Sequence, residues 1–350
     1  MTFLTGRLKL ARLMASVALA ACSAPNPSLP ASVSTATTAS GVIPPDGPSA
    51  PSKAAFDVHE WGLVDVQSSG AAALAAGPAR GRTNWNAPRR KPVLYFHLAQ
   101  ATPAIDATVT VTTKAMGFIE HFPKGQLSSD ALTLTWRDLH VRKESCHVVG
   151  APTRESPECR TSDGQCEAAE LATYETADAS CIEVAGASYN HLFYRANGPP
   201  PPLPFEVVVK GNQLSMTHVR ASDVVGFILY VHNDSGSVTV TMVAPPALGQ
   251  SIAMGPPQGT DIAAAQRSLD STMKEVGLTD AETAAFDRAW QNDLFGGDAA
   301  RDAPSRGATA GPEDYLLFAM PGSLLNGAST VTITPAPRAL HRFMLVRLRV

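Results

Sequence analysis

The segment Phe56 to Val66, FDVHEWGLVDV, marks the point at which the chain begins to alternate like β-structure. Successive side chains of a strand point to opposite faces, so a strand here would place His59 and Trp61 on one face and Glu60 on the other. Short β-branched and aromatic runs recur from here to the last residue, whereas the preceding residues lack them. The sequence therefore predicts one β-rich body, residues 55 to 350, that opens with this strand.

The first residues of the chain indicate export. Three basic residues, Arg7, Lys9 and Arg12, precede the uncharged run Leu13 to Ala21, which is the arrangement of a signal peptide. The run is too short to remain as a membrane-spanning helix, which needs about 20 residues. We predict that residues 1 to 21 are a signal peptide that is removed on export.

A lipid anchor is predicted at the end of this signal. The run Leu19-Ala20-Ala21-Cys22 resembles the bacterial lipobox, which implies cleavage before Cys22, a thioether-linked lipid on its sulfur and acylation, such as by palmitate, of its new amino group. Ser23 follows instead of Asp, which favours the outer membrane. The alternative is an ordinary secretory signal with an incidental cysteine. We expect an outer-membrane lipoprotein that faces the periplasm or the cell surface and contacts the membrane through Cys22.

Residues 22 to 54 consist mainly of Ala, Ser, Thr and Pro. Such a segment cannot bury enough apolar surface to fold, so it is predicted to be a disordered tether. Cleavage of the signal removes three positive and no negative charges, which takes the formal net charge from −3 to −6. A mildly acidic protein has no electrostatic attraction to nucleic acid, so nucleic acid is not expected as a partner.

Four cysteines remain in the body. An even number in an exported protein predicts two disulfides, and all three possible pairings stay open. The cysteines lie in an acidic segment, residues 144 to 183, that we interpret as a surface excursion held by disulfides. A metal site that includes His147 is the alternative, but the spacings lack the close Cys-x-x-Cys pairs typical of zinc sites. The four are Cys146, Cys159, Cys166 and Cys181.

The remaining pattern predicts a mainly β fold of antiparallel, sandwich-like sheets. The period becomes helical between residues 260 and 295, where Gly277 separates two apolar stripes and Thr279-Asp280-Ala281-Glu282 forms a capping box. We expect an αα-hairpin inserted there. The other expected strands are Pro92–Leu98, Ala107–Thr113, Phe118–Phe122, Ala131–Trp136, His191–Arg195, Phe205–Lys210, Val225–His232, Ser237–Val243, Tyr315–Met320, Thr330–Thr334 and Leu340–Val350.

Two charged residues stand out on apolar strand faces. Glu60 is the one charge on its face of the first strand, and Arg342 is the one charge on a face of the last strand. A buried carboxylate needs a partner, and first and last strands are often neighbours. We therefore predict a buried, bidentate structural ion pair between Glu60 and Arg342, with Arg195 as the alternative partner.

His59 beside Glu60 suggests acid–base or metal chemistry, but adjacent strand residues point apart, and no His-Glu-x-x-His motif is present. No serine-nucleophile elbow, phosphate-binding loop or dinucleotide fingerprint is present either. We therefore assign no catalytic residue, no metal and no cofactor, and we regard the face with His59 and Trp61 as a possible functional face. The other histidines are scattered, and their spacing does not require them to meet: His97, His121, His140, His191, His218 and His232.

Val58-His59-Glu60-Trp61-Gly62 opens the body, and Pro92 to His97 follows as an apolar strand. With later blocks, these runs resemble a family of exported bacterial proteins of unknown function that begin with a VHEWG-like segment. Leu63-Val64 departs from the Thr-Phe pair usual in that family. The resemblance implies one co-folded body and an envelope location, and it transfers no catalytic role. The later blocks are Leu192–Arg195, Gly277–Phe295 and Ile333–Pro337.

These observations predict an envelope-anchored lipoprotein whose body is a non-catalytic binding or structural module, with a protein or glycan as its possible ligand. The alternative is a metal-dependent or other hydrolase with a site near His59 and Glu60. Three His, Asp or Glu side chains converging in one cleft near His59 would favour the enzyme. A Glu60 held by arginine in a closed core would favour the binding module.

Overall fold

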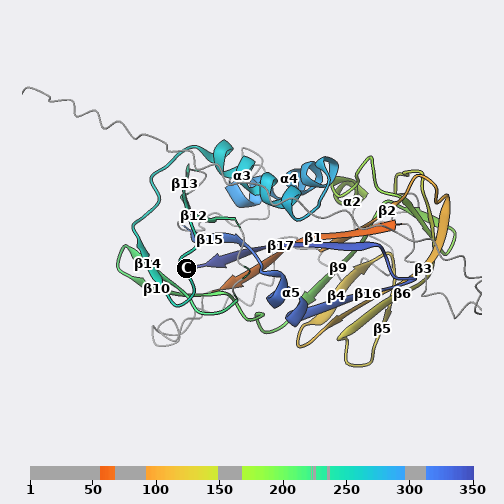
Figure 1. Ribbon diagram of the computed structural model, residues 1–350, viewed down its shortest axis with the longest axis horizontal. Helices are drawn as coiled ribbons and strands as arrows, with labels where there is room; N and C mark the ends of the chain where they lie inside the picture. The colour runs from red at the N-terminus through yellow and green to blue at the C-terminus, as the bar shows by residue number, and fades with distance from the viewer. Residues whose placement is uncertain are drawn as a thin grey trace, which may run out of the picture. The chain divides into compact units, whose positions relative to one another are not determined.

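An eight-stranded sheet lies at the centre of the fold, and it contains both the first and the last of the described strands (Figure 1). The computed structural model describes residues 56–67, 92–148, 168–221, 223, 226–234, 237–295 and 313–350. Contacts between residues group Pro51–Val350 as one unit. The predicted signal peptide, the lipidation site Cys22 and the predicted tether lie outside the described residues.

The described elements form three sheets and four helices. The central sheet consists of β1 (Phe56–Gln67), β2 (Val93–Leu98), β4 (Gly117–Phe122), β9 (Leu192–Asn197), β12 (Ile228–Asp234), β13 (Ser237–Val243), β15 (Glu313–Ala319) and β17 (Ala339–Arg349). The second sheet consists of β3 (Ala104–Thr113), β5 (Gln126–Leu127), β6 (Thr133–Arg142), β7 (Cys181–Val184), β8 (Ala187–Tyr189) and β16 (Ser329–Thr334). The third consists of β10 (Phe205–Lys210), β11 (Gln213–His218) and β14 (Ser251–Met254). The helices are α2 (Ala168–Thr173), α3 (Ile262–Glu275), α4 (Asp280–Phe295) and α5 (Gly322–Ala328).

The predicted mainly β fold with antiparallel sheets is confirmed, with one exception at its centre. The order of the central sheet is β13-β12-β15-β17-β1-β2-β9-β4, and β1 runs parallel to β17 while it pairs antiparallel with β2. Parallel strands are usually buried on both faces and read as continuous apolar runs. Six consecutive residues of β17, Phe343 to Leu348, are buried, and all of them are apolar except Arg347, which pairs with Asp65.

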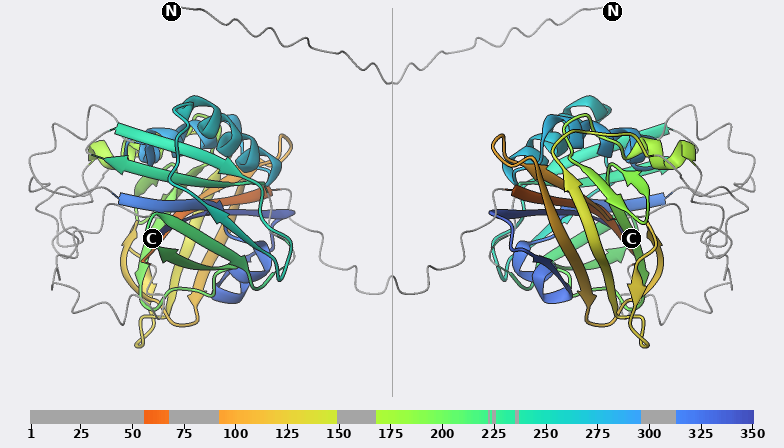
Figure 2. Two further views of the ribbon diagram at one scale, coloured as in Figure 1. Left: turned by 90° about the vertical axis from the view of Figure 1, so that its left-hand side faces the viewer. Right: turned by 90° about the vertical axis from the view of Figure 1, so that its right-hand side faces the viewer.

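Alternate side chains of the central sheet enter two different cores. On β15, Tyr315 and Leu317 belong to the core that includes α3 and α4, whereas Leu316 and Phe318 belong to the core that includes the third sheet. Figures 1 and 2 both show α3 and α4 lying along one side of the central strands. The sheet is therefore covered on both faces, which explains why its strands are apolar rather than strictly alternating.

The helical hairpin forms where the change of period predicted it. Asp261 caps α3 by accepting a hydrogen bond from the Ala264 backbone N–H at 2.8 Å, and Gly277 follows the helix with a φ of 106°. This left-handed conformation suits glycine and ends the helix. The short turn then leads directly into α4, as expected for an αα-hairpin.

The acidic segment 144–183 contains one described disulfide, Cys146–Cys181. Cys159 and Cys166 lie outside the described residues. The end of the segment is more buried than the predicted surface excursion, because Leu171, Tyr174 and Ile182 pack in the main core. The large apolar residues after position 170 are few, but they supply part of the core. The composition of the whole segment had not indicated this.

Within the described ranges, no helix has the length and apolar character needed to cross a membrane.

Candidate metal centre

Two histidines lie side by side on the central sheet. His59 is on β1 and His97 is on β2, two positions apart in the antiparallel register, in which Asp57 faces His97 and His59 faces Tyr95. Their ring centroids are 4.3 Å apart. Because residues at this spacing on neighbouring strands share a face, the register alone brings the two imidazoles together.

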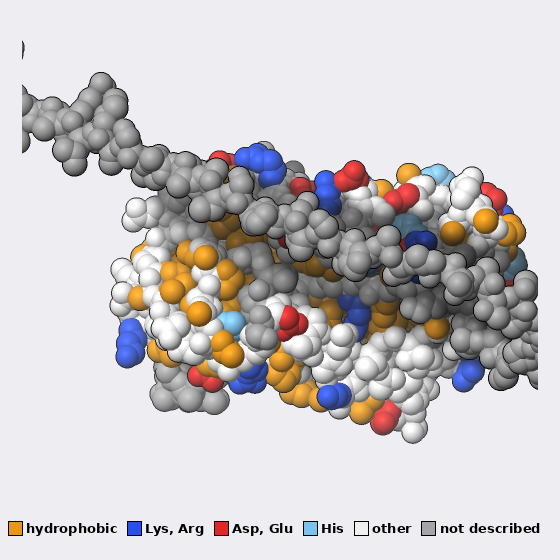
Figure 3. Space-filling model, in the orientation of Figure 1, with side chains coloured by type: hydrophobic (Ala, Val, Ile, Leu, Met, Phe, Trp, Pro, Cys, Tyr) orange, Lys and Arg blue, Asp and Glu red, His pale blue; other side chains and the backbone are white. Residues whose placement is uncertain are grey.

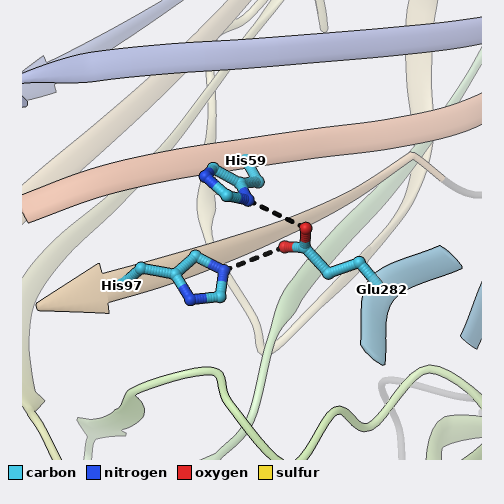
Figure 4. A group of neighbouring side chains, drawn as sticks. All are labelled: His59, His97 and Glu282. Atoms are coloured by element: carbon cyan, nitrogen blue, oxygen red, sulfur yellow. Dashed lines mark hydrogen bonds and ion pairs between the residues drawn. The ribbon is translucent and has the colours of Figure 1, made fainter. Parts of the chain in front are cut away.

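The third member of the group, Glu282, comes from the first turn of α4. Its Oε2 lies 2.8 Å from His59 Nδ1 and its Oε1 lies 2.9 Å from His97 Nε2 (Figure 4). An ionised carboxylate can only accept hydrogen bonds, so both imidazole nitrogens act as donors. One carboxylate therefore links two strands to the helical hairpin.

The capping box of α4 holds Glu282 in this position. The Thr279 backbone N–H donates to Glu282 Oε2 at 2.8 Å, and the Glu282 backbone N–H donates to Thr279 Oγ1 at 3.1 Å. These reciprocal bonds satisfy two backbone donors of the helix start. The predicted capping box is thus confirmed, and its carboxylate reaches past the helix to the two histidines.

The electrostatics favour an ionised Glu282. Burial raises the pKa of its carboxyl group, but the hydrogen bonds and charges of His59 and His97 outweigh burial and lower the pKa to about 2. The position at the start of α4 favours a negative charge as well. For His97, burial lowers the pKa, and the contact with Glu282 together with the backbone of Asp178 more than compensates, so its pKa is raised.

His59, His97 and Glu282 can together hold a metal ion. One ligand atom from each lies within 4.8 Å of the other two. Imidazole nitrogen and carboxylate oxygen are ligands of divalent first-row metals such as Zn²⁺. Ligand atoms around a tetrahedral zinc are about 3.3 Å apart, given bonds of about 2.0 Å. Two of the contacts here are 2.8 and 2.9 Å, so a metal would require each histidine to move slightly away from Glu282 and to lose the imidazole proton that it donates.

A third histidine borders the group without joining it. His341 on β17 faces His59 in the parallel register, and their ring centroids are 4.9 Å apart. Its Nδ1 lies 2.8 Å from the Val276 carbonyl oxygen at the end of α3. His341 therefore fixes the helical hairpin on the sheet and closes one side of the group.

Glu60 and Arg342 are paired on the opposite side of β1. They face each other in the parallel register, and Arg342 Nε donates to Glu60 Oε2 at 2.6 Å. The contact uses one nitrogen rather than the bidentate fork expected, because the other guanidinium nitrogens donate to Ser329 and Asn326. Tyr194 donates to Glu60 Oε1 at 2.7 Å.

The other residues considered from sequence lie in separate environments. Trp61 is fully buried and packs edge-on against Phe286 of α4, with ring centroids 5.4 Å apart. The face with His59 and Trp61 is therefore covered by α4 rather than open to solvent. Arg195, the alternative partner of Glu60, lies beside Glu120 instead. His147 contacts Glu175 at 2.8 Å.

Sequence reasoning identified His59 but missed its partners His97 and Glu282. His97 could have been found by pairing the predicted strand Pro92–Leu98 with the opening strand, since each of the two strands carries a histidine. Glu282 was recognised as a capping residue, but nothing in the helical period shows which strand the helix start will contact.

Comparisons with known proteins give no assignment. No protein-family model matches the chain, and no curated protein matches it significantly. Among solved structures, the Mu homology domain of Fcho1 from Danio rerio with bound Eps15 peptide aligns over 85% of this chain and 97% of its own length. The identity is 9% and the TM-score is 0.29, so the alignment does not indicate a shared fold. The resemblance to an exported family stays a prediction.

Proposed function

We propose that this protein is a lipid-anchored envelope protein whose β-rich body is a binding module for a divalent transition-metal ion. The observation that supports metal binding is the convergence of His59, His97 and Glu282 from three separate elements, with ligand atoms within 4.8 Å of one another. The proposed signal peptide and the lipobox ending at Cys22 support the envelope location. A protein or glycan ligand for the same body remains a separate prediction.

The chemistry of the three side chains favours zinc or a neighbouring first-row ion over calcium or magnesium. Two imidazoles and one carboxylate match the His₂Glu sets of zinc proteins and the two-histidine, one-carboxylate sets of iron(II) proteins. Calcium and magnesium prefer oxygen ligands alone. The contact of His97 with the Asp178 backbone also matches the way metal-binding histidines are commonly oriented by a carbonyl group.

A metal-dependent hydrolase is the second candidate, since three protein ligands leave a coordination position for water. Access to the group favours binding over catalysis. His59 is 5% exposed and Glu282 is 0% exposed, so a bulky substrate has little surface to approach. A cavity among the described residues is lined by Asp138 and residues 183–188, and none of the three side chains contributes to it.

Metal titration of the full chain tests the proposal. After treatment with a chelator and removal of the chelator, the protein is expected to bind one zinc ion per chain by equilibrium dialysis with elemental analysis. Zinc at 100 times its dissociation constant should raise the free energy of unfolding by about 2.7 kcal/mol. His97→Asn and Glu282→Gln should each weaken zinc binding at least about tenfold.

His232→Asn is the matched control for these variants. His232 contacts Asp314 at 2.9 Å on the same central sheet, so it is also a histidine–carboxylate pair, but it has no third ligand within the described residues. Its substitution should leave zinc binding unchanged. Failure of the unsubstituted chain to bind zinc, iron(II), cobalt or nickel would contradict the proposed function and leave the three residues as a structural contact.

The anchor has its own test. Cells that express the full chain should incorporate an alkyne analogue of palmitate into it and retain it in the membrane fraction, and Cys22→Ser should abolish both. A Cys22→Ser protein that stays lipidated and membrane-bound would exclude the predicted anchor.

A further inference from the structure

The outer edge of the third sheet is exposed and apolar. β10 pairs with β11 on one side, and no other described strand pairs with its other side. Val208 and Val209 are 43% and 49% exposed. Figure 3 shows hydrophobic side chains gathered over the part of the surface where Figure 1 draws β10 and β14. A regular apolar edge strand is a template for pairing with another extended segment.

The hairpin determines which backbone groups of β10 face this open edge. Along an antiparallel ladder, residue pairs that exchange backbone hydrogen bonds alternate with pairs that do not. The Val219 backbone N–H donates to the Pro204 carbonyl oxygen at 2.9 Å, so every second residue from Pro204 onward bonds toward β11. The N–H and C=O groups of Val207 and Val209 therefore point to the open edge.

We propose that this edge is a self-association site, in which β10 of one chain pairs antiparallel with β10 of a second copy. The register is centred on Val208, which faces its own counterpart. Val207 of each copy faces Val209 of the other, and these residues exchange backbone hydrogen bonds. Glu206 of each copy faces Lys210 of the other, so the pair is related by a two-fold axis, as in most homodimers.

The charge pattern identifies a second copy as the occupant of this edge. Glu206 and Lys210 are exposed at equal distances from Val208, on the same side of the strand. An antiparallel self-pair therefore places opposite charges directly across from each other at both ends, which stabilises cross-strand pairs. A foreign strand would use the same backbone groups, but the segment EVVVK is complementary to itself.

Three other described edge strands are less suited to this pairing. β13 is bridged at Val240 by Gly259. β4 shows a register irregularity against β9 between Phe118 and Glu120, and such irregularities disturb further pairing. β16 exposes threonines rather than valines. β10 has a regular register with β11 along its whole length, which leaves its outer backbone groups evenly spaced for a partner.

Charge reversal tests the register. The purified full chain should show a monomer–dimer equilibrium in sedimentation velocity over a series of protein concentrations. Lys210→Glu or Glu206→Lys should each weaken the dimer about tenfold, because each creates two like-charge pairs. The double variant, which exchanges the two charges, should restore association, and an equimolar mixture of the two single variants should form a heterodimer.

A cysteine cross-link tests the centre of the register. Non-bonded antiparallel pairs have Cα atoms about 4.5 Å apart, within the range of a disulfide. Val208→Cys should therefore give a covalent dimer on mild oxidation, whereas Met242→Cys, at a residue 52% exposed on β13, should not. Val207→Pro should abolish the dimer without unfolding the chain, because the lost N–H is not used in the β10–β11 hairpin.

Two results would overturn the self-association site. One is a chain that stays monomeric at every concentration. This result counts against self-association even if the monomer pairs this edge with an extended peptide of another protein. The other is a dimer that persists unchanged in Val207→Pro and in both charge-reversal variants, because such a dimer must use another surface.

Discussion

Glu282 connects three elements of the structure: α4, β1 and β2. It caps α4, accepts hydrogen bonds from two histidines on two strands, and is fully buried. A buried carboxylate is tolerated only when its acceptor sites are occupied by donors. Here three N–H groups fill them, so the residue stabilises the fold with or without a bound metal.

Replacing this carboxylate should destabilise the metal-free protein. Glu282→Gln keeps the size of the side chain but presents an NH₂ group to at least one N–H donor, so a buried donor loses its partner. We expect the free energy of unfolding in the presence of a chelator to fall by about 1 to 3 kcal/mol, measured by denaturant titration. Glu275→Gln, at an exposed position of α3, should change it by less than about 0.5 kcal/mol. Equal effects of the two changes would contradict the role of Glu282.

Asp270 on α3, in the helical hairpin, makes the stability of the protein depend on pH. Its Oδ1 is buried with no hydrogen-bond partner among the described residues. Burial and the charge of Asp287 on α4 raise its pKa to about 6, against a smaller opposing effect of Lys274. The native state therefore holds a proton that the unfolded state has already lost between about pH 4 and pH 6, and stability falls as pH rises through this window.

Asp270→Asn should remove this loss. At pH 7.5 the variant is expected to be more stable than the unsubstituted chain by about 1 to 2 kcal/mol, roughly half of the full conversion of the pKa shift because the side chain is only half-buried. The difference should vanish below about pH 4, where the aspartic acid is protonated in both states. Thermal unfolding from pH 3.5 to 8 measures it, and a difference that is constant across this range would contradict the assignment.

Patterns within one strand or helix were sufficient to predict local features. Contacts between strands and helices were harder to predict. Glu60 and Arg342 could be paired from sequence because each is the one charge on an otherwise apolar strand face. Thr279 to Glu282 could be identified as a cap because the signal is local. The full group of His59, His97 and Glu282 could not be assembled from the sequence, because it depends on the register of two strands and on how a helix docks across them.

At the scale of elements, the turn between α3 and α4 packs against the central sheet. Gly277 has a φ of 106°, and a Cβ placed on it would lie 2.3 Å from His341 Nδ1. Both the backbone conformation and the space require glycine. The turn therefore determines the position of α4, and with it the position of Glu282.

Gly277→Ala should cost more than the backbone conformation alone. We expect a loss of about 2 to 4 kcal/mol in the free energy of unfolding, from the left-handed conformation and from overpacking against His341. Gly249→Ala is the matched control, because Gly249 also has a positive φ but has open space around its Cβ position. It should cost only about 1 to 2 kcal/mol. Equal losses would show that the contact with His341 contributes nothing.

The elements missed from sequence are mainly short or polar. β11 and β14 were not expected, because residues 213–218 mix polar and apolar types and residues 251–254 are few. α5 spans seven residues with two glycines, which gives no helical period. Longer apolar runs such as β2, β15 and β17 were predicted at nearly their observed positions, because burial on both faces leaves a clear apolar signature.

At the scale of the whole molecule, the fold depends on the pairing of its first and last described strands. β1 and β17 are neighbours along eleven paired residues, although almost the whole body lies between them in sequence. Contacts at such separation require closure of a very long loop, which makes them slow to form in folding. The Glu60–Arg342 pair lies within this junction and gives it a specific register, since a shift of β17 by one residue would move Arg342 to the face opposite Glu60.

Breaking this pair should therefore destabilise the entire body. Arg342→Met leaves Glu60 buried without its cation, and we expect a loss of about 3 to 5 kcal/mol in the free energy of unfolding.

Glu60→Gln combined with Arg342→Met should cost less than the sum of the single changes, with a coupling energy of about 0.5 to 3 kcal/mol in a double-mutant cycle. Arg338→Met, which breaks the more exposed pair between Asp57 of β1 and the residue just before β17, should have a much smaller effect. Denaturant unfolding followed by tryptophan fluorescence and by circular dichroism measures all four proteins. The two probes should give coincident transitions, because the first and the last described strands belong to one sheet. Strictly additive losses would mean that the pair does not set the register of the junction.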